Sequence, residues 1–568
     1  MNLYQLTLFG AVLLGSATLS AQSTYCSKLP VKPGKGVTVT GVVECDGKPV
    51  AGVKVSDGYE ITKTDKKGAY YLKSKKQNPQ VFISIPSGYE ASREDAVPQF
   101  WADFTEPADK LERHDFKLNK VNQDKHAIIA ITDVHLANQR NDVSIFSGPY
   151  LDVIREDVKS FNDQGIPVYT LNMGDSSWDI YWYAHNYTIG DFRNTLKEAN
   201  YPTPIFTVMG NHDNDPATPE GPDTDFQASL PFQKAFGPRY YSFDIGKVHY
   251  VMLDNIKYKN EAVEQEIYPG IKSRRNYTEE FTPEQMEWLK KDLSDVSYDT
   301  PIVIACHCPV IRPDGPDHKG YRPRLDGEST RELLDIVKPY KDVHCFTGHS
   351  HRQTLTRTPK EEQNFVDHNI SGTCASWWRT RASGLKNLCP DGTPAAYELM
   401  TVDGTDLKWE HVPYEYDRNR KFFAWDMNGV KDYFANNAEA QVFLKHHPKF
   451  TDYTDLPDNY IYLSLWDYDP EGSLKVTENG KELPVEFLSD ENPLWALSYA
   501  LRLSLWVNRL VNNGFAKPRK SHLARVRATT PDAPVEITLT DAFGKETKET
   551  LQRPAAFHLE YNSAIDNF

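Results

Sequence analysis

Hydrophobic and polar positions divide the chain into three stretches with different periodicities. In the first, residues 36 to 118, β-branched and polar residues alternate between Asp-Gly and Lys-Gly turns, as in GVTVTGVVECDGKPVAGVKVSDG and TDKKGAYYL. Alternation with a period of two between turn residues is typical of short strands with one buried face. We therefore predict a small N-terminal β-sandwich, and no residue of this stretch suggests catalysis.

In the second stretch, from about residue 124, short apolar runs alternate with helical patterns. The apolar runs read HAIIAITD, PVYTLNMGD, PIFTVMGNHD, HYVMLDN, PIVIACHCP and VHCFTGHSH, and each resembles a buried strand. Helix signals lie between them, as apolar spacing over 151–161, a capping box at Thr282–Gln285 and a second cap at Ser329 with Glu332. Strands that alternate with helices predict a layered α/β or α+β domain.

The third stretch, after about residue 415, is again rich in strand patterns. It contains YIYLSLWDY, a hairpin signal around Asn479-Gly480, HLARVRA and PVEITLTDAFG. The apolar run 493–511 is long enough to raise the question of a membrane segment, but Arg502, Asn508 and Arg509 would be costly in lipid. We predict a β-rich C-terminal domain in which this run is buried.

Length and charge set the frame for these three stretches. At 568 residues the chain is too long for one core, and we place the domains at 22–120, 121–412 and 413–568. The formal net charge is −15. An acidic chain has no global positive field to attract a polyanion, so we do not expect nucleic acid as a partner.

The N-terminus carries an apolar segment, residues 1–21, that ends in small residues before Gln22. This pattern predicts a signal peptide and a secreted or periplasmic protein without a transmembrane segment in the mature chain, although a short membrane anchor is the alternative. Seven cysteines are an odd number spread over a long chain. They do not predict a dense disulfide framework, and a Cys26–Cys45 bridge stays open.

Residues of the types that bind metals follow the apolar strands of the middle stretch. In chain order they are Asp133, His135, Asp175, Asn211, His212, Asp213, His307, His349 and His351. Sites in layered α/β domains lie beyond the carboxyl ends of the strands, so these residues can converge. Asp133 and His135 are two apart and can face the same side, as can His349 and His351.

Each of these motifs alone has a structural explanation. A single Asp-x-His or Gly-Asp is more often a turn, and His307 alone could be a hydrogen-bonded core histidine. The recurrence of such residues after successive strands favours a site. Within IACHCP the alternation sets Cys306 and Cys308 opposite His307, so we interpret the thiols as packing groups. The glycines Gly174, Gly210 and Gly348 let the backbone turn sharply where a side chain would crowd the site.

Together, D133-x-H135, G174-D175, G210-N211-H212-D213, H307 and G348-H349-x-H351 resemble the calcineurin-like metallophosphoesterases. The resemblance covers roughly residues 124 to 412 and implies a β-sandwich of two sheets flanked by helices. The first stretch resembles the carboxypeptidase regulatory-like domain, an immunoglobulin-type fold. The flanking domains are similar to those that accompany a secreted bacterial branch of the phosphoesterase family.

The resemblance also implies a ligand set for two metal ions. It assigns the first ion to Asp133, His135, Asp175 and His351, and the second ion to Asp175, Asn211, His307 and His349. Carboxylate, imidazole and amide ligands suit Mn, Fe or Zn, and the sequence does not choose among them. Purple acid phosphatases carry a tyrosine three residues after the bridging aspartate, where this chain has Trp178. The purple subgroup is therefore not expected.

The function implied is hydrolysis of a phosphomono- or phosphodiester by a hydroxide that bridges the two ions. His212 is the predicted general acid, and Asp213 is predicted to orient it. The substrate is expected to be a small phosphorylated compound such as a nucleotide, a lipid headgroup or a glycan phosphate. Candidates to contact it are the aromatic residues Trp178, Tyr181, Trp182, Tyr183, Trp377 and Trp378 and the arginines Arg379 and Arg381. Alternatively, the aromatic residues pack loops and a domain interface and the arginines are solvated. The alternative is a surface binding or scaffold protein that retains a weakly active phosphoesterase core. The sequence does not predict the oligomeric state.

Overall fold

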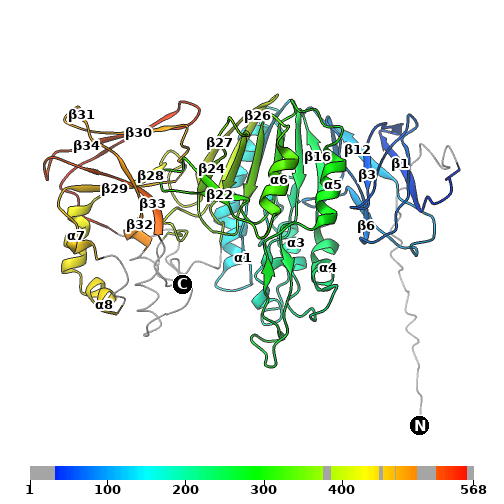
Figure 1. Ribbon diagram of the computed structural model, residues 1–568, viewed down its shortest axis with the longest axis horizontal. Helices are drawn as coiled ribbons and strands as arrows, with labels where there is room; N and C mark the ends of the chain where they lie inside the picture. Colours follow the sequence, from blue (N-terminus) through cyan, green and yellow to red (C-terminus); the bar gives the residue numbers. More distant parts are fainter. Residues whose placement is uncertain (1–31, 375–385, 447–451, 467, 496–519, 559–568) are drawn as a thin grey trace, which may run out of the picture.

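The protein is described by a computed structural model that places residues 32–374, 386–446, 452–466, 468–495 and 520–558. Figure 1 shows three parts in a row: an N-terminal β part, a central part of strands and helices, and a C-terminal part. The predicted signal peptide, Cys26 and the candidates Trp377, Trp378, Arg379 and Arg381 lie outside the described residues. The expectations attached to them stay predictions.

The N-terminal part is a β-sandwich. One sheet has the order β11-β1-β12-β7 with β2 and β5 paired to β1, and the other has the order β10-β6-β3-β4. The strands are β1 (Val39–Cys45), β2 (Lys48–Pro49), β3 (Lys54–Ser56), β4 (Ile61–Lys63), β5 (Ala69–Leu72), β6 (Gln80–Ile83), β7 (Tyr89–Ala91), β10 (Trp101–Asp103), β11 (Glu112–Arg113) and β12 (Phe116–Lys120). A short ribbon of β8 (Arg93–Glu94) and β9 (Val97–Pro98) follows β7. The predicted sandwich is confirmed.

The central part contains two larger sheets. The first has the order β15-β14-β13-β26-β27, and the second has the order β16-β17-β20-β23-β25-β24. Their strands are β13 (Lys125–Ile131), β14 (Val168–Asn172), β15 (Ile205–Thr207), β16 (Tyr241–Ile245), β17 (Val248–Met252), β20 (Ile302–Ala305), β23 (Val343–Thr347), β24 (Thr354–Arg357), β25 (Phe365–Asn369), β26 (Ala396–Asp403) and β27 (Asp406–Pro413). Two small ribbons leave this core, β18 (Lys257–Tyr258) with β19 (Tyr277–Thr278) and β21 (Ile311–Pro313) with β22 (Tyr321–Pro323).

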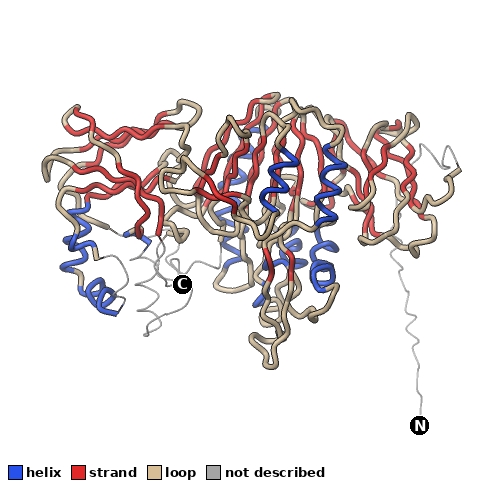
Figure 2. The backbone as a smooth tube through the Cα atoms, in the orientation of Figure 1, coloured by secondary structure: helices blue, strands red, loops and turns tan. Residues whose placement is uncertain are grey.

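Helices flank the two central sheets, as Figure 2 shows. They are α1 (Asp142–Ile145), α2 (Leu151–Asn162), α3 (Ile189–Glu198), α4 (Thr224–Phe236), α5 (Pro283–Leu293) and α6 (Ser329–Val337). Alternate residues of β13 enter different cores: Ile128 packs with the second sheet, whereas Ile129 packs with α2, α3 and α4. A strand with two covered faces must be apolar at every position, which explains the continuous run HAIIAI. The layered sandwich flanked by helices is confirmed.

The helix predictions are largely confirmed. The segment 151–161 lies in α2, and Thr282 caps α5, where its side chain accepts a hydrogen bond from the backbone N–H of Gln285 at 3.4 Å. The reciprocal half of the predicted capping box is wrong, because the side chain of Gln285 bonds to the backbone of Asp254 at 2.8 and 2.7 Å. The predicted cap of α6 is wrong by one residue. The N-cap residue is Glu328, while the Ser329 hydroxyl accepts a hydrogen bond from the backbone N–H of Phe281 at 3.1 Å. A tertiary contact thus uses the hydroxyl that the local pattern assigned to capping.

The C-terminal part has two sheets and three helices among its described residues. The sheets have the orders β28-β29-β33-β32 and β31-β30-β34-β35. The elements are β28 (Phe422–Asp426), α7 (Met427–Asn436), α8 (Ala438–His446), β29 (Tyr460–Leu465), β30 (Ser473–Glu478), β31 (Lys481–Glu482), β32 (Glu486–Glu491), α9 (Pro493–Trp495), β33 (Lys520–Arg527), β34 (Val535–Thr540) and β35 (Glu546–Leu551). The predicted hairpin joins β30 to β31, with Asn479 and Gly480 at φ 51° and 75°.

The apolar run 493–511 is described only at its start, where Pro493, Leu494 and Trp495 are buried, and residues 496–519 lie outside the described part of the chain. In the portion that the structure describes, no helix combines the length and the apolar character needed to cross a bilayer.

Candidate metal centre

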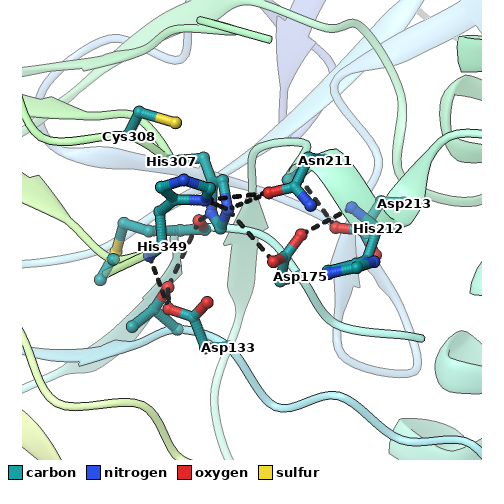
Figure 3. Close-up of polar contacts among 12 residues, drawn as sticks. Asp133, Asp175, Asn211, His212, Asp213, His307, Cys308 and His349 are labelled. Atoms are coloured by element: carbon teal, nitrogen blue, oxygen red, sulfur yellow. Dashed lines mark hydrogen bonds and ion pairs between the residues drawn. The ribbon is translucent and has the colours of Figure 1, made fainter. Parts of the chain in front are cut away.

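The strand ends of both central sheets bring the predicted ligands together. Strands β13, β14 and β15 run parallel in the first sheet, and β20 and β23 run parallel in the second. The loops that follow these five strands carry, in order, Asp133 with His135, Asp175, Asn211, His307, and His349 with His351. Figure 3 shows side chains from these loops pointing toward one another between the sheets. The carboxyl ends of parallel strands meet at one edge, which is why residues so far apart in sequence converge.

One group of ligand atoms gathers around His351. The Nε2 atom of His351 lies 2.9 Å from Oδ1 of Asp133 and 3.0 Å from Nε2 of His135. The Nε2 atom of His135 lies 3.7 Å from Oδ2 of Asp175. Ligand atoms of Asp133, His135, Asp175 and His351 all lie within 4.8 Å of one another, and all four residues are buried.

A second group gathers around His307. Its Nε2 atom lies 3.2 Å from Oδ2 of Asp175 and 3.2 Å from Oδ1 of Asn211. The Nδ1 atom of His349 lies 2.9 Å from Oδ1 of Asn211 and 3.2 Å from Nε2 of His307. Asp175 belongs to both groups, so one carboxylate links two adjacent sets of nitrogen and oxygen donors.

The chemistry of these donors fits cations. Two pairs of imidazole nitrogens face each other at 3.0 and 3.2 Å beside buried carboxylates. Burial would raise the pKa of Asp133 and of Asp175, but the neighbouring histidines, led by His351 and His307 respectively, hold both pKa values below the ordinary range. Both side chains are therefore anionic. A pair of buried anions surrounded by imidazoles is a set that divalent or trivalent ions would complete.

The backbone at this centre is in an unusual conformation. Five predicted ligands have a positive φ: 52° at Asp133, 50° at His135, 52° at Asp175, 64° at His349 and 52° at His351. The left-handed conformation costs a non-glycine residue about 1–2 kcal/mol. Backbone hydrogen bonds hold it here, because the N–H groups of Asp133 and His135 donate to Gly174 and Asp175 at 2.9 Å. Strain of this kind is concentrated at functional sites.

Two of the three site glycines are required for close approach rather than for a turn. Gly174 has φ +86°, but Gly210 and Gly348 lie outside the left-handed region. A Cβ at Gly210 would lie 2.1 Å from Oδ1 of Asp175, and a Cβ at Gly348 would lie 2.4 Å from Oδ2 of Asp133. The ligand carboxylates occupy the space of the missing side chains. The prediction that a side chain at these two glycines would crowd the site is therefore confirmed, while their backbone does not adopt the left-handed conformation.

His212 stands beside this centre with its ring held by a carboxylate. Its backbone N–H donates to Oδ1 of Asp175 at 2.8 Å, and its Nδ1 lies 2.6 Å from Oδ1 of Asp179. The guanidinium of Arg275 donates through Nε to Oδ2 of Asp179 at 2.5 Å. Burial would lower the pKa of His212, but Asp175 and Asp179 outweigh it and raise the pKa above its ordinary value.

Models of three protein families match the chain. The model for calcineurin-like phosphoesterases matches residues 126–353, and models for the N-terminal and C-terminal domains of these proteins match residues 37–121 and 367–546. The chain belongs to the calcineurin-like phosphoesterase family. It is therefore a metal-dependent phosphoester hydrolase, and its buried cluster of histidines and aspartates could hold metal ions.

Among solved structures this phosphoesterase is similar to the purple acid phosphatase PPD1 of yellow lupin (Lupinus luteus), at 12% identity over 64% of this chain and 67% of that chain, with a TM-score of 0.34. It is also similar to GAP50 of Plasmodium, at 12% identity over 51% and 85% with a TM-score of 0.30. A third structure, the sulfate thiohydrolase SoxB of Thermus thermophilus, has 11% identity over 51% and 56% with a TM-score of 0.28. A comparison with curated proteins finds no significant match.

Asp213 does not hold His212 in this phosphoesterase, so the predicted pairing is wrong. Its carboxylate accepts hydrogen bonds from the backbone N–H groups of Ser176 at 3.0 Å, Ser177 at 3.1 Å and Gly210 at 3.0 Å. Burial, together with the charge of Asp175, raises the pKa of Asp213 to about 7. The carboxylate of Asp213 therefore connects the loop after β14 to the loop after β15. It is directed to backbone N–H groups and not to the ring of His212.

Two thiols lie closer to the centre than the sequence suggested. Ligand atoms of His307, Cys308 and His349 lie within 4.8 Å of one another, and so do those of His135, His351 and Cys374. Burial raises the pKa of Cys308 well above its ordinary value. Coordination to a metal removes the proton of a thiol, so the sulfur of Cys308 could hold an ion together with His307 and His349, and the interpretation of Cys308 as a packing group stays a prediction.

Three side chains around the centre were not predicted from the sequence. They are Asp179 and Arg275, which hold His212, and Glu279, whose Oε1 lies 3.3 Å from Nε2 of His349. The sequence could have indicated Asp179 as a site residue, because it follows the predicted ligand Asp175 by four residues in the same loop. No such indication exists for Arg275 and Glu279, since they lie in the long excursion between β17 and α5, where no periodic pattern assigns a position.

Proposed function

We propose that this phosphoesterase uses two metal ions, one in each group of ligands, to hydrolyse small phosphate esters, with His212 as the general acid. The observation that carries the proposal is the position of Asp175, whose Oδ2 lies 3.7 Å from His135 Nε2 and 3.2 Å from His307 Nε2. A carboxylate shared by two donor sets is what a dinuclear centre needs. Bound there, two ions would activate a water molecule and neutralise charge on the phosphoryl oxygens.

The protein's own contribution is to place a proton donor beside this centre. The Nδ1–H group of His212 is directed to Asp179, so the proton available for transfer is the one on Nε2. The hydrogen bond from the His212 backbone to Asp175 fixes the distance between ring and ligand set. Donation from Nε2 to the departing oxygen would avoid the release of an unprotonated alkoxide.

Asp179 and Arg275 are positioning residues in this proposal. Asp179 is fully buried and charged, because His212 and Arg275 offset the effect of burial and hold its pKa below the ordinary value. A buried anion at Nδ1 fixes the tautomer and the direction of the ring, as second partners of catalytic histidines do. Its bond to Arg275 joins the long excursion after β17 to the site.

The first experiment is hydrolysis of p-nitrophenyl phosphate and of bis(p-nitrophenyl) phosphate by the purified protein. Each is assayed after chelation and after addition of Mn²⁺, Fe²⁺ or Zn²⁺. We expect metal-dependent turnover of at least one ester, and the ratio between the two reports the preference for monoesters or diesters. A protein that binds two ions per chain but hydrolyses neither ester would instead support the scaffold alternative.

The general acid is tested with His212→Asn and with leaving groups of different acidity. A positioned acid contributes about 10²–10⁴-fold in rate, and its contribution grows when the leaving group is a poorer one. We expect the variant to lose far more activity on phenyl phosphate than on p-nitrophenyl phosphate, while elemental analysis finds unchanged metal content. His114→Asn, in the N-terminal sandwich, is the control. An equal loss on both esters would remove His212 from the role of acid.

A further inference from the structure

A cavity of about 430 Å³ opens beside the metal centre. His349 and Ser350 of the loop after β23 line its inner end. One wall comes from the central part, mainly from the β21–β22 ribbon, and the opposite wall comes from β29, β32 and β33 of the C-terminal part. The cavity therefore begins at a predicted metal ligand and runs between two parts of the chain.

The wall from the central part is strongly basic. Four arginines line the cavity: Arg312, Arg322, Arg324 and Arg352. Arg312 and Arg322 are direct partners across the β21–β22 ribbon, a position where like charges destabilise each other. Partial burial, followed by the repulsion of Arg322 and Arg324, lowers the pKa of Arg312. The whole chain has a net charge of −15, so this local concentration of positive charge is opposite in sign to the overall charge of the protein.

Carboxylates of the described residues do not account for this charge. Arg324 is paired with Glu279, but Arg322 has only Asp314 at 3.9 Å, with both side chains exposed, and no ion pair of Arg312 occurs among the described residues. Asp391 is the single carboxylate among the described residues that line the cavity, and it already accepts hydrogen bonds from the backbone of Gln353 and Thr393 at 2.9 Å.

Docking of the C-terminal part does not require these arginines either. Among the contacts between the two parts is a two-pronged ion pair of Arg357 with Asp469 at 3.0 and 2.6 Å, and none of the ion pairs across this boundary among the described residues uses Arg312 or Arg322. Both side chains of this pair are largely buried. Arg312 and Arg322 are exposed on the cavity side of this contact. Arg312 and Arg322 are therefore available to bind an anionic group that enters the cavity.

The wall from the C-terminal part offers aromatic surface. Trp466, Tyr468 and Phe487 line it, and the rings of Tyr468 and Phe487 lie 5.1 Å apart. The indole N–H of Trp466 is fully buried and has no acceptor among the described residues. Because this nitrogen is buried, the wall offers the cavity apolar ring surface and not this donor.

We propose that this cavity binds the organic part of the phosphate ester and that this part carries a second anionic group, recognised by Arg312 and Arg322. The inference rests on the proposed function, because it takes the scissile phosphate to lie at the metal centre. The two arginines are direct partners across the ribbon and both line the cavity, and guanidinium groups suit a phosphate or a carboxylate because each can bind it through two N–H groups. The aromatic wall would cover a ring or another flat apolar face of the same molecule.

The test uses three aryl esters that share one ring: phenyl phosphate, 4-carboxyphenyl phosphate and benzene-1,4-diol bisphosphate. Each is assayed with the metal-loaded wild type, with Arg312→Gln/Arg322→Gln, and with the control Arg93→Gln/Arg331→Gln, which removes two exposed arginines that do not line the cavity. Comparing proteins on one ester cancels differences in leaving group. We expect the cavity variant to lose about tenfold or more in kcat/KM on at least one of the two esters that carry a second anionic group.

On phenyl phosphate the cavity variant should stay within about twofold of the wild type, and the control should do so on all three esters. Loss on the bisphosphate alone identifies a phosphate as the second anionic group, whereas loss on both the bisphosphate and 4-carboxyphenyl phosphate shows that either anion is recognised. An equal loss on all three esters, or no loss on either ester with a second anionic group, would overturn the proposal.

A binding measurement separates failure of this proposal from failure of the proposed function. The melting temperature of each metal-loaded protein is measured with benzene-1,4-diol bisphosphate and with phenyl phosphate. We expect the bisphosphate to raise the melting temperature of the wild type more than phenyl phosphate does, and this difference to vanish in the cavity variant. If the wild type hydrolyses no ester but its melting temperature still rises more with the bisphosphate than with phenyl phosphate, the proposed function fails and the proposed binding site in the cavity is supported. If it hydrolyses the esters without any such difference, the cavity proposal fails alone.

Discussion

A single buried carboxylate, Asp179, decides what the ring of His212 can do. It lies between the imidazole and the guanidinium of Arg275, with contacts of 2.6 and 2.5 Å. His212 could not keep a fixed tautomer without an acceptor at Nδ1, because either ring nitrogen can carry the proton of a neutral imidazole. The function proposed for His212 therefore depends on a residue that is neither a metal ligand nor a neighbour in sequence.

Asp179→Asn should lower kcat while leaving the metals in place. The amide keeps the size of the side chain but removes the charge that fixes the ring, and partners of this kind contribute about 10–100-fold. Activity is measured against pH, with metal content determined on the same samples. Asp163→Asn, at an exposed position, is the control.

A purely structural role for Asp179 would not change the form of the pH profile. We expect the basic limb of the kcat profile of Asp179→Asn to shift to lower pH, because Asp179 is one of the carboxylates that raise the pKa of His212. An unchanged profile with unchanged activity would remove Asp179 from the site.

At the scale of secondary structure, the centre depends on how closely the ends of neighbouring strands approach. The backbone N–H of Gly348, after β23, donates to the carbonyl oxygen of His307, after β20, at 2.8 Å. The position of a Cβ at Gly348 lies 1.9 Å from Oγ1 of Thr132, at the end of β13. The two sheets therefore approach each other closely at Gly348. This close approach sets the positions of the ligands that follow β13, such as Asp133, and of those that follow β20 and β23.

Gly348→Ala should loosen the centre although it adds one methyl group. Contacts below 3.0 Å force neighbouring atoms to shift, and the atoms nearest the new methyl group are Thr132 Oγ1 and Asp133 Oδ2, which also accepts a hydrogen bond from the N–H of His349 at 2.8 Å. We expect at least one ion to be lost on dialysis, with activity reduced by about 10–100-fold as for disturbed metal sites. Gly221→Ala, where a Cβ meets no atom within 4 Å, is the control. Full metal content in Gly348→Ala would contradict this account.

At the scale of the whole molecule, the N-terminal sandwich and the central part share one hydrophobic core, and a buried charge network crosses between them. Lys54 of β3 donates to Oδ1 of Asp292 in α5 at 3.0 Å. His249 of β17 contacts Asp292 Oδ2 at 2.9 Å and Asp244 Oδ1 at 2.7 Å. The sandwich is thus attached through charges buried beneath it.

This network makes stability depend on pH. Burial would lower the pKa of His249, but Asp292 and Asp244 outweigh it and raise the pKa to about 9. Since the unfolded value is about 6.5, protonation of His249 stabilises the fold fully below pH ~6.5 and ceases to do so as the pH rises through about 9. The contribution that is lost is on the order of a few kcal/mol.

The prediction is tested with His249→Gln in urea unfolding between pH 6 and pH 10. We expect the wild type to be clearly more stable than the variant at pH 6 and the difference to shrink above pH 8. Lys63→Gln, which removes the exposed ion pair of Lys63 with Asp295, should cost about 0–1 kcal/mol. A difference between wild type and His249→Gln that stays constant over the whole range would contradict the raised pKa.

Patterns with a fixed period were predicted well because they depend only on neighbours in sequence. The apolar spacing of α2, the capping residues of α5 and the Asn479-Gly480 hairpin all follow from local geometry. Interactions through space were not predictable in this way. Asp213 was favoured because it is adjacent in sequence to His212, yet the folded loops direct it to backbone N–H groups and bring in Asp179 instead.

By itself, the sequence determined the donor types, their order along the chain and the strands that precede them, because these are fixed by residue identity and periodicity. Only the tertiary structure decided which donors meet, which carboxylate holds His212, and that the C-terminal part closes a basic cavity beside His349. The physical reason is that ligand distances and hydrogen bonds depend on how separate strands and domains pack. Packing brings together residues such as Asp179 and Arg275, which are 96 positions apart in the sequence, and no local sequence pattern predicts that they are in contact.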